Sequence, residues 1–129
     1  MLDVLIVDDS AAIRKILQRV LRQTGIPIGN IVEAGDGREA LEALKTQTVG
    51  LALLDINMPN MDGLELLGHL KASETWAHLP VIIVSTEGSQ TKVLEAVKMG
   101  ASGYVRNPFN ADQIKEKLAE ILQPGFYRT

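Results

Sequence analysis

The sequence predicts an α/β fold in which one parallel sheet is covered by helices on both faces. Five short apolar runs alternate along the chain with five segments that have the apolar periodicity of a helix. The runs lack the polar alternation of a half-exposed strand, which is typical of strands buried on both faces. The connections are short, as in successive βα units with right-handed crossovers.

The first two units are marked by capping residues. Residues 4–7 predict the first strand, after which Ser10 can cap a helix that Gly25 ends. The apolar residues of this helix recur three and four positions apart: Ile13, Ile16, Leu17, Val20 and Leu21. Residues 31–34 predict the second strand, and Asp36 begins a capping-box sequence for the second helix. That helix turns two leucines inward, Leu41 and Leu44.

The third and fourth units follow the same pattern. Residues 51–54 predict the third strand, and a loop with Pro59 and Asp62 leads to the third helix. Residues 81–84 predict the fourth strand, after which Ser89 can cap the fourth helix. The inward apolar residues of these helices are Leu64, Leu67 and Leu70 in the third, and Val93 and Val97 in the fourth.

The fifth unit predicts the end of the folded domain. Residues 104–105 lie on the fifth strand, and Asn107–Pro108 leads to a helix that Pro124–Gly125 stops. The inward residues of this helix are Ile114, Leu118, Ile121 and Leu122. We expect one domain over residues 1–123 and a short tail at 124–129, with no room for an effector domain.

Composition excludes several classes of function. The 129 residues suit one domain, and 46% apolar with 22% charged residues is ordinary for a soluble globular protein. A net charge of −3 argues against direct nucleic-acid binding. The absence of cysteine excludes disulfides, thiolate catalysis and zinc–thiolate sites. No apolar stretch is long enough to span a bilayer, so we expect a cytoplasmic protein without membrane insertion.

Three aspartates at strand ends are the candidate functional groups. Asp8 and Asp9 follow the first apolar run, and Asp55 follows the third. Ligands of open parallel sheets collect beyond the carboxyl ends of the strands, so we expect these carboxylates to share one crevice. Clustered like charges raise one another's pKa unless a cation lies between them. Hard oxygen ligands without His or Cys predict Mg²⁺ or a similar divalent ion.

Four segments of the chain resemble the receiver domains of bacterial two-component response regulators. These are Leu54-Asp55-Ile56-Asn57-Met58-Pro59-Asn60-Met61-Asp62-Gly63-Leu64, Val7-Asp8-Asp9-Ser10, Ser85-Thr86-Glu87, and Gly100-Ala101-Ser102-Gly103-Tyr104-Val105 with Pro108-Phe109. They occur in the family's order and spacing over nearly the whole chain. The length and the Asn-Met-Pro-Asn-Met-Asp-Gly run are most similar to the stand-alone, CheY-like chemotaxis regulators of this family.

The resemblance implies a flavodoxin-like (βα)5 sheet with strand order 2-1-3-4-5 and a phosphorelay function. Asp55 would be the phosphoacceptor, taking a phosphoryl group from a histidine kinase, a phosphotransfer protein or a small phosphodonor. Asp9 and Asp55 would bind Mg²⁺ directly, Asp8 would act through water, and the backbone carbonyl of Asn57 would complete the shell. Beyond its own phosphoryl transfer and dephosphorylation, the family implies no enzymatic activity.

The resemblance also implies a switch that a protein target reads. Ser85 would donate its hydroxyl to a phosphoryl oxygen, and Tyr104 would move inward when Ser85 shifts toward the phosphate. The surface that binds the target would be the fourth helix, fifth strand and fifth helix, around Lys92, Tyr104 and Arg106.

Position 107 departs from the family pattern. The family has a Lys immediately before the Pro-Phe pair, where its ammonium pairs with the phosphoryl group, and this chain has Asn107. The Asn amide is uncharged and shorter than a Lys side chain. Alternation along a strand turns the neighbouring Arg106 to the opposite face, with Tyr104, so we do not expect Arg106 to replace the lysine.

Two other functions lack residues that they need, and a third remains as an alternative. A phosphatase of the haloacid dehalogenase type needs a second Asp two residues after the nucleophile, where this chain has Asn57. A flavin-binding protein of this fold needs a phosphate loop after the first strand, where Asp8 and Asp9 would repel the phosphate. Asn107 motivates the third alternative, a receiver-like module that binds proteins independently of phosphorylation.

Overall fold

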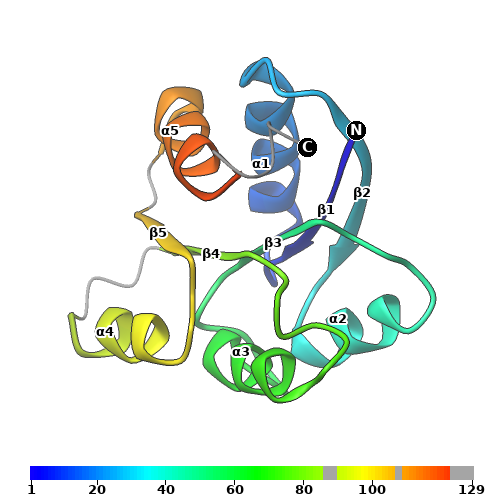
Figure 1. Cartoon of the computed structure of the whole chain (residues 1–129), viewed down its shortest axis with the longest axis vertical. Coiled ribbons are helices and arrows are strands. Elements are labelled where there is room, and N and C mark those ends of the chain that lie inside the picture. Colours follow the sequence, from blue (N-terminus) through cyan, green and yellow to red (C-terminus); the bar gives the residue numbers. More distant parts are fainter. Residues whose placement is uncertain (86–89, 107–108, 123–129) are drawn as a thin grey trace.

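One twisted sheet forms the centre of the molecule, with helices on both of its faces (Figure 1). The computed structural model describes residues 1–85, 90–106 and 109–122. Strands and helices alternate in the order β1 (Leu2–Val7), α1 (Ala11–Gln23), β2 (Ile28–Ala34), α2 (Gly37–Leu44), β3 (Leu51–Leu54), α3 (Gly63–Ala72), β4 (Val81–Ser85), α4 (Gln90–Lys98), β5 (Gly103–Arg106) and α5 (Ala111–Leu122).

The strands are all parallel and lie in the order β2-β1-β3-β4-β5, which confirms the predicted fold. The strand register determines which residues meet at the carboxyl edge of the sheet. Val7 of β1 pairs with Leu54 of β3, and Leu54 pairs with Ile83 of β4. The residues that follow these pairs therefore leave the sheet side by side.

The two faces of the sheet bury separate apolar clusters. Leu5 and Val7 of β1 pack with residues of α2, α3 and α4, whereas Val4 and Ile6 pack with residues of α1 and α5. Figure 1 shows the same division, with α1 and α5 on one side of the sheet and the other three helices opposite. Among the described helices, none has the length and apolar composition that crossing a membrane requires.

The helix starts follow the predicted caps where the structure describes them. Ser10 accepts a hydrogen bond from the Ile13 N–H at 3.2 Å and begins α1. Asp36 accepts from the Glu39 N–H at 2.9 Å and begins α2. The Glu39 carboxylate accepts from the Gly35 N–H at 2.9 Å, one residue before the position that a standard capping box would use. The predicted cap Ser89 and the tail 124–129 lie outside the described residues.

The loop between β3 and α3 folds back tightly onto its own start. The Gly63 N–H donates to the Ile56 carbonyl at 2.8 Å, which brings the first residue of α3 against the backbone of Asp55. A Cβ at position 63 would overlap the Asp55 carbonyl oxygen, so only glycine fits. The position of Asp55 therefore depends on the absence of a side chain eight residues later.

We predict that Gly63→Ala lowers the free energy of unfolding by about 2 kcal/mol or more, because backbone atoms cannot yield to the new methyl group. Urea denaturation measures this change. Gly68→Ala is the matched control on the same helix, since its Cβ would meet only the end of the Met99 side chain at 3.4 Å. That control should be neutral or slightly stabilising, as Ala favours a helix interior over Gly. Equal losses in both variants would contradict the close approach at Gly63.

Candidate functional site

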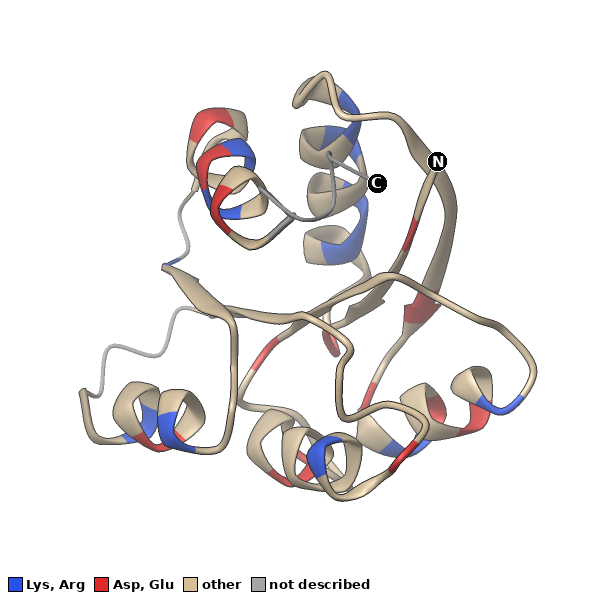
Figure 2. Cartoon of the chain, viewed as in Figure 1, with Lys and Arg blue, Asp and Glu red and all other residues tan. Residues whose placement is uncertain are grey.

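Three carboxylates meet at the carboxyl edge of the sheet. Asp8 and Asp9 follow β1, Asp55 follows β3, and one ligand oxygen from each lies within 4.8 Å of the others. Figure 2 shows acidic positions where the chain leaves these two central strands. Asp8 is buried, Asp55 is half-buried and Asp9 is exposed, so the cluster opens to solvent on one side. The edge predicted from the strand ends therefore brings these three side chains together.

Backbone hydrogen bonds hold the two inner aspartates in place. The Asp55 N–H donates to the Val7 carbonyl at 2.9 Å, and the Asp8 N–H donates to the Ala34 carbonyl at 3.1 Å. These bonds continue the ladders of β1 with β3 and with β2 past the ends of the strands. The hydrogen bonds of the sheet thus fix the backbone positions of both Asp8 and Asp55 at the site.

Ser85 completes the site from β4. Its side chain is buried, and the hydroxyl Oγ donates to the Asp55 carboxylate Oδ1 at 2.8 Å. With the three aspartates, Ser85 lines a shallow cavity of about 210 Å³. Such a volume admits a small tetrahedral group and a few waters. A hydroxyl in this position can donate to a carboxylate or to an oxygen of a group attached to it.

Burial and mutual repulsion raise the pKa of two of the carboxyls. Burial raises the pKa of Asp8 to about 6, with a contribution from the Asp55 and Asp9 charges, against the lowering effect of the Ser10 N–H bond. Burial likewise raises the pKa of Asp55, against the lowering effect of the Ser85 hydroxyl and of two backbone N–H groups. Both groups hold their negative charge at a cost that a cation between them would relieve.

The donor set fits a hard divalent cation. Three carboxylate oxygens within 4.8 Å of one another, with solvent access through Asp9, match the preference of Mg²⁺ for a few carboxylates plus water. The described part of the chain places no histidine among these ligands. Asn57, whose backbone carbonyl the family resemblance adds to the set, lies on the same loop two residues after Asp55.

An interaction that the sequence analysis did not anticipate fixes the loop after Asp55. Asn60 has a positive φ of 64° and donates its side-chain amide to Asp36 Oδ2 at 2.7 Å. The Asn60 amide and the Glu39 N–H lower the pKa of Asp36. The Gly37 N–H donates to the Met61 carbonyl at 3.0 Å. The residue type of Asn60 was a signal in the sequence, because Asn is among the few residues that tolerate a positive φ. The spacing along the chain does not reveal that Asp36 is its hydrogen-bond partner.

Lys92 lies closer to the site than the prediction of a readout role suggests. It is in the first turn of α4, and its ammonium Nζ lies 3.5 Å from the Asn57 side-chain oxygen Oδ1. The contact joins α4 to the loop that follows Asp55. Its side chain is therefore directed toward the loop of the aspartate site.

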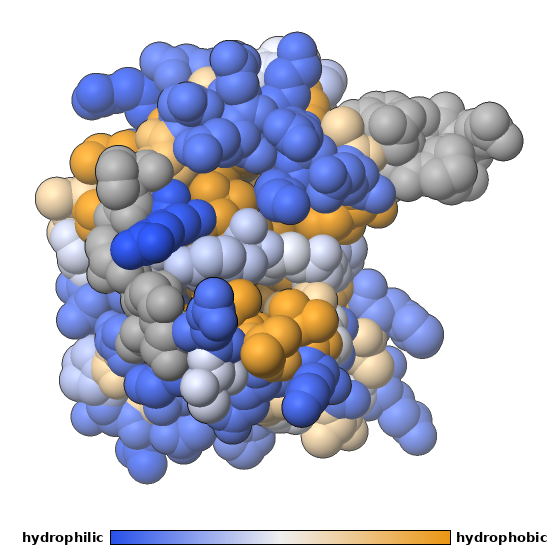
Figure 3. All heavy atoms as spheres, turned by 90° about the vertical axis from the view of Figure 1, so that its left-hand side faces the viewer, coloured by the Kyte–Doolittle hydropathy of each residue, from blue (hydrophilic) through white to orange (hydrophobic). Residues whose placement is uncertain are grey.

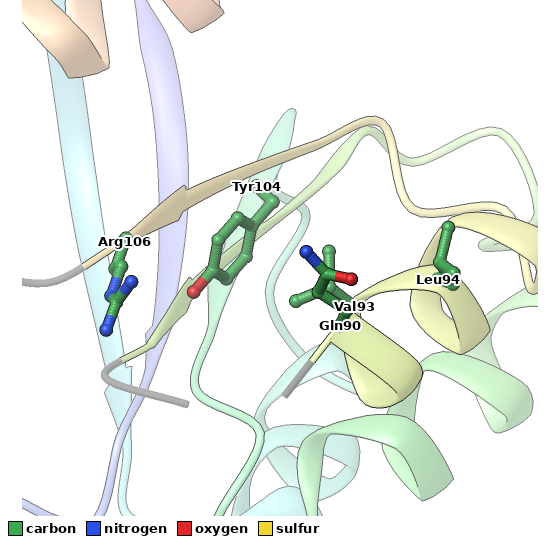
Figure 4. A pocket seen from close by; sticks show the side chains of 5 residues that line it. All are labelled: Gln90, Val93, Leu94, Tyr104 and Arg106. Carbon is green, nitrogen blue, oxygen red and sulfur yellow. The ribbon is translucent and has the colours of Figure 1, made fainter. Parts of the chain in front are cut away.

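Tyr104 and Arg106 lie together on the edge strand β5, as alternation predicts. The Tyr104 hydroxyl is 3.4 Å from the backbone carbonyl of Ser85, to which it donates. Both residues line a groove of about 400 Å³ with Gln90, Val93 and Leu94 of α4 (Figure 4). Figure 3 shows apolar patches on this face of the molecule. Asn107, the position that departs from the family pattern, lies outside the described residues.

Comparisons with known proteins agree with this architecture. Residues 4–119 match the family described as the response regulator receiver domain. Chemotaxis protein CheY-3 of Vibrio cholerae is 39% identical over 120 residues, covering 93% of this chain and 91% of the relative. Chemotaxis protein CheY of Pseudomonas aeruginosa is also 39% identical, over 93% of this chain and 95% of the relative. CheY of Borrelia burgdorferi, solved in a CheX-CheY-BeF3-Mg complex, superposes with a TM-score of 0.86 at 27% identity, covering 95% of this chain and 90% of that one.

The raised pKa of Asp8 predicts how stability changes with pH in metal-free solution. The ordinary value is 3.8 and the folded value is about 6, so the folded state binds the proton more tightly than the unfolded chain does. The contribution of Asp8 to the free energy of unfolding should therefore fall as the pH rises from 3.8 to about 6, and this loss should persist above that range. At pH 7.5, Asp8→Asn should therefore have a free energy of unfolding about 1–3 kcal/mol higher than that of the parent, measured by urea denaturation.

The two proteins should converge near pH 4, and saturating Mg²⁺ should reverse their order because the ion stabilises only the charged site. Asp112→Asn, an exposed change in the first turn of α5, is the control and should show neither effect. Asp8→Asn less stable than the parent at pH 7.5 in a chelator would contradict the repulsion.

Proposed function

We propose that this chain, which belongs to the response regulator receiver domain family, accepts a phosphoryl group on Asp55 and relays the signal to a protein target. The observation that carries the proposal is the setting of Asp55. Its carboxylate lies at the open edge of the sheet between the Ser85 hydroxyl and the two other aspartates. The donor would be the phosphohistidine of a kinase or phosphotransfer protein.

The side chains of the site suit phosphoryl transfer to a carboxylate. An Asp55 oxygen attacks the phosphorus of the donor, the bond from phosphorus to the donor breaks, and the donor keeps that electron pair. Burial raises the pKa of Asp55, which makes its carboxylate more nucleophilic. The Ser85 hydroxyl, which donates to Asp55 Oδ1 at 2.8 Å, would donate to a phosphoryl oxygen once Asp55 is phosphorylated.

The carboxylate cluster supports Mg²⁺ as the cofactor. Asp8, Asp9 and Asp55 would hold it together with the Asn57 backbone carbonyl, and the bound ion would neutralise charge on the transferring group. Without a cation, the phosphoryl group would enter a site that already holds two further negative charges. The Borrelia relative, whose complex contains Mg and BeF3, supports this assignment.

We further propose that the target binds the face formed by α4, β5 and α5. This face carries the exposed apolar side chain Leu94, 58% accessible, beside the groove that Tyr104 and Arg106 line. The Tyr104 hydroxyl contacts the Ser85 backbone, so movement of Ser85 toward a phosphoryl group would reach this groove directly. The chemotaxis relatives support a cytoplasmic chemotaxis pathway as the setting.

The alternative function is protein binding that needs no phosphorylation. It rests on Asn107, which leaves the fifth strand-to-helix connection without the cation found in the family. The two functions differ in one measurable property, the formation of an acyl phosphate.

Asp55 should gain one phosphoryl group when the protein is incubated with acetyl phosphate and Mg²⁺, and Asp55→Asn should gain none. Intact-protein mass spectrometry with peptide mapping measures both. Asp112→Asn removes an exposed carboxyl elsewhere and should be phosphorylated like the parent, and a chelator should abolish the reaction. An unmodified parent, or a phosphoryl group on another residue, would favour the alternative.

Beryllium fluoride with Mg²⁺ should shift the backbone amide signals of Leu94, Tyr104 and Arg106 in an NMR titration. Trp76 serves as an internal control, because it lines a groove with Gly50 and Pro80, which precede β3 and β4 at the opposite edge of the sheet. Its indole signal should stay in place. Shifts confined to residues around the aspartates would show that the site is not coupled to the proposed face.

A further inference from the structure

We propose that Lys92 is the cation that pairs with the phosphoryl group on Asp55, and that it does so from α4. The inference rests on the proposed phosphorylation of Asp55 and assigns to Lys92 a contact with the transferred group. In the structure the Lys92 ammonium lies 3.5 Å from the side-chain oxygen of Asn57, two residues after the acceptor. On phosphorylation the ammonium would leave this amide for a phosphoryl oxygen.

The charge balance at the site creates the need for such a group. Phosphorylation attaches a group of about two negative charges beside Asp8 and Asp9, and one divalent ion cannot neutralise all of them. Arg14 also lies beside the site, where it contacts groups other than Asp55. Its guanidinium donates to the Asp8 backbone carbonyl and to Glu33 Oε1, the latter at 3.0 Å. Arg14 therefore links the backbone of Asp8 to Glu33 on the neighbouring strand β2.

The position of Lys92 is unfavourable for its own helix. It lies in the first turn of α4, where backbone N–H groups point outward and favour negative charge, yet this turn contains no acidic residue. Its contact with the neutral amide of Asn57 at 3.5 Å is at the outer limit of a hydrogen bond, and a charged phosphoryl oxygen would be a stronger partner for the ammonium. The four-carbon stem allows this movement without unwinding the helix.

The consequence is a direct connection between the acceptor and the groove on the proposed binding face. Lys92 is the residue before Val93, which lines that groove with Leu94 and Tyr104. Pairing Lys92 with the phosphoryl group would draw the first turn of α4 toward the site. Phosphorylation would then change the groove from two sides, through Ser85 and Tyr104 on one side and through Lys92 on the other.

The test compares Lys92→Gln, Lys92→Arg and the parent in two separate titrations. The first measures binding of beryllium fluoride at saturating Mg²⁺ by NMR, and Lys92→Gln should weaken it about tenfold, the usual scale for a charge-assisted hydrogen bond. The second measures Mg²⁺ binding without the phosphoryl mimic. There Lys92→Gln should bind as well as the parent or up to about twofold more tightly, because a nearby positive charge has been removed.

Lys92→Arg should restore most of the affinity for beryllium fluoride, since the charge is retained. Lys98→Gln is the matched control, an exposed lysine in the last turn of the same helix, and should match the parent in both titrations. A parent that binds no beryllium fluoride overturns the phosphorylation proposal and this inference with it. A parent that binds, with equal binding by Lys92→Gln, overturns the inference alone. Parallel losses of Mg²⁺ and beryllium fluoride in Lys92→Gln also overturn it, because they would indicate a structural role.

Discussion

The register of the parallel sheet forces three like charges into one small space, and the rest of the site depends on this constraint. Val7 and Leu54 are paired neighbours in β1 and β3, so the aspartates that follow them leave the sheet together. Their carboxylate oxygens, with that of Asp9, lie within 4.8 Å of one another. The core that buries both faces of β1 and β3 supplies the free energy that holds this arrangement against electrostatic repulsion. The site is thus an unfavourable local arrangement that the sheet maintains.

The residues around the aspartates keep this arrangement in one geometry. Gly63 lets α3 begin against the backbone of Asp55, and Asn60 ties the intervening loop to Asp36 at the start of α2. Ser85 gives Asp55 a hydrogen-bond partner from β4. Each of these contacts joins a different element to the same edge, so a change of charge on Asp55 would act on several elements at once.

Two contacts lead from the acidic edge toward the groove between α4 and β5. One runs from Ser85 to the Tyr104 hydroxyl through a backbone carbonyl at 3.4 Å, and the other joins the Asn57 side chain to Lys92 at 3.5 Å. Both distances are long for hydrogen bonds, so each of these two contacts is weak. The groove therefore lies where small movements around Asp55 would reach it from two directions.

The sequence alone determined the order of elements, the sheet that they form and the edge where the aspartates lie. These features follow from local periodicity and from strand ends, and the described residues confirm them, with β1 and β2 beginning two and three residues earlier than predicted because apolar alternation does not mark where pairing starts. Only the tertiary structure decided the partners of Ser85, Asn60 and Lys92. Each of these contacts joins residues at least 24 positions apart on different elements. Contacts between residues so far apart in the sequence depend on the register of the sheet and on the packing of helices against it. Neither residue type nor spacing along the chain encodes these contacts. Lys92 illustrates the limit, since its place on α4 was evident from the sequence and the direction of its ammonium was not.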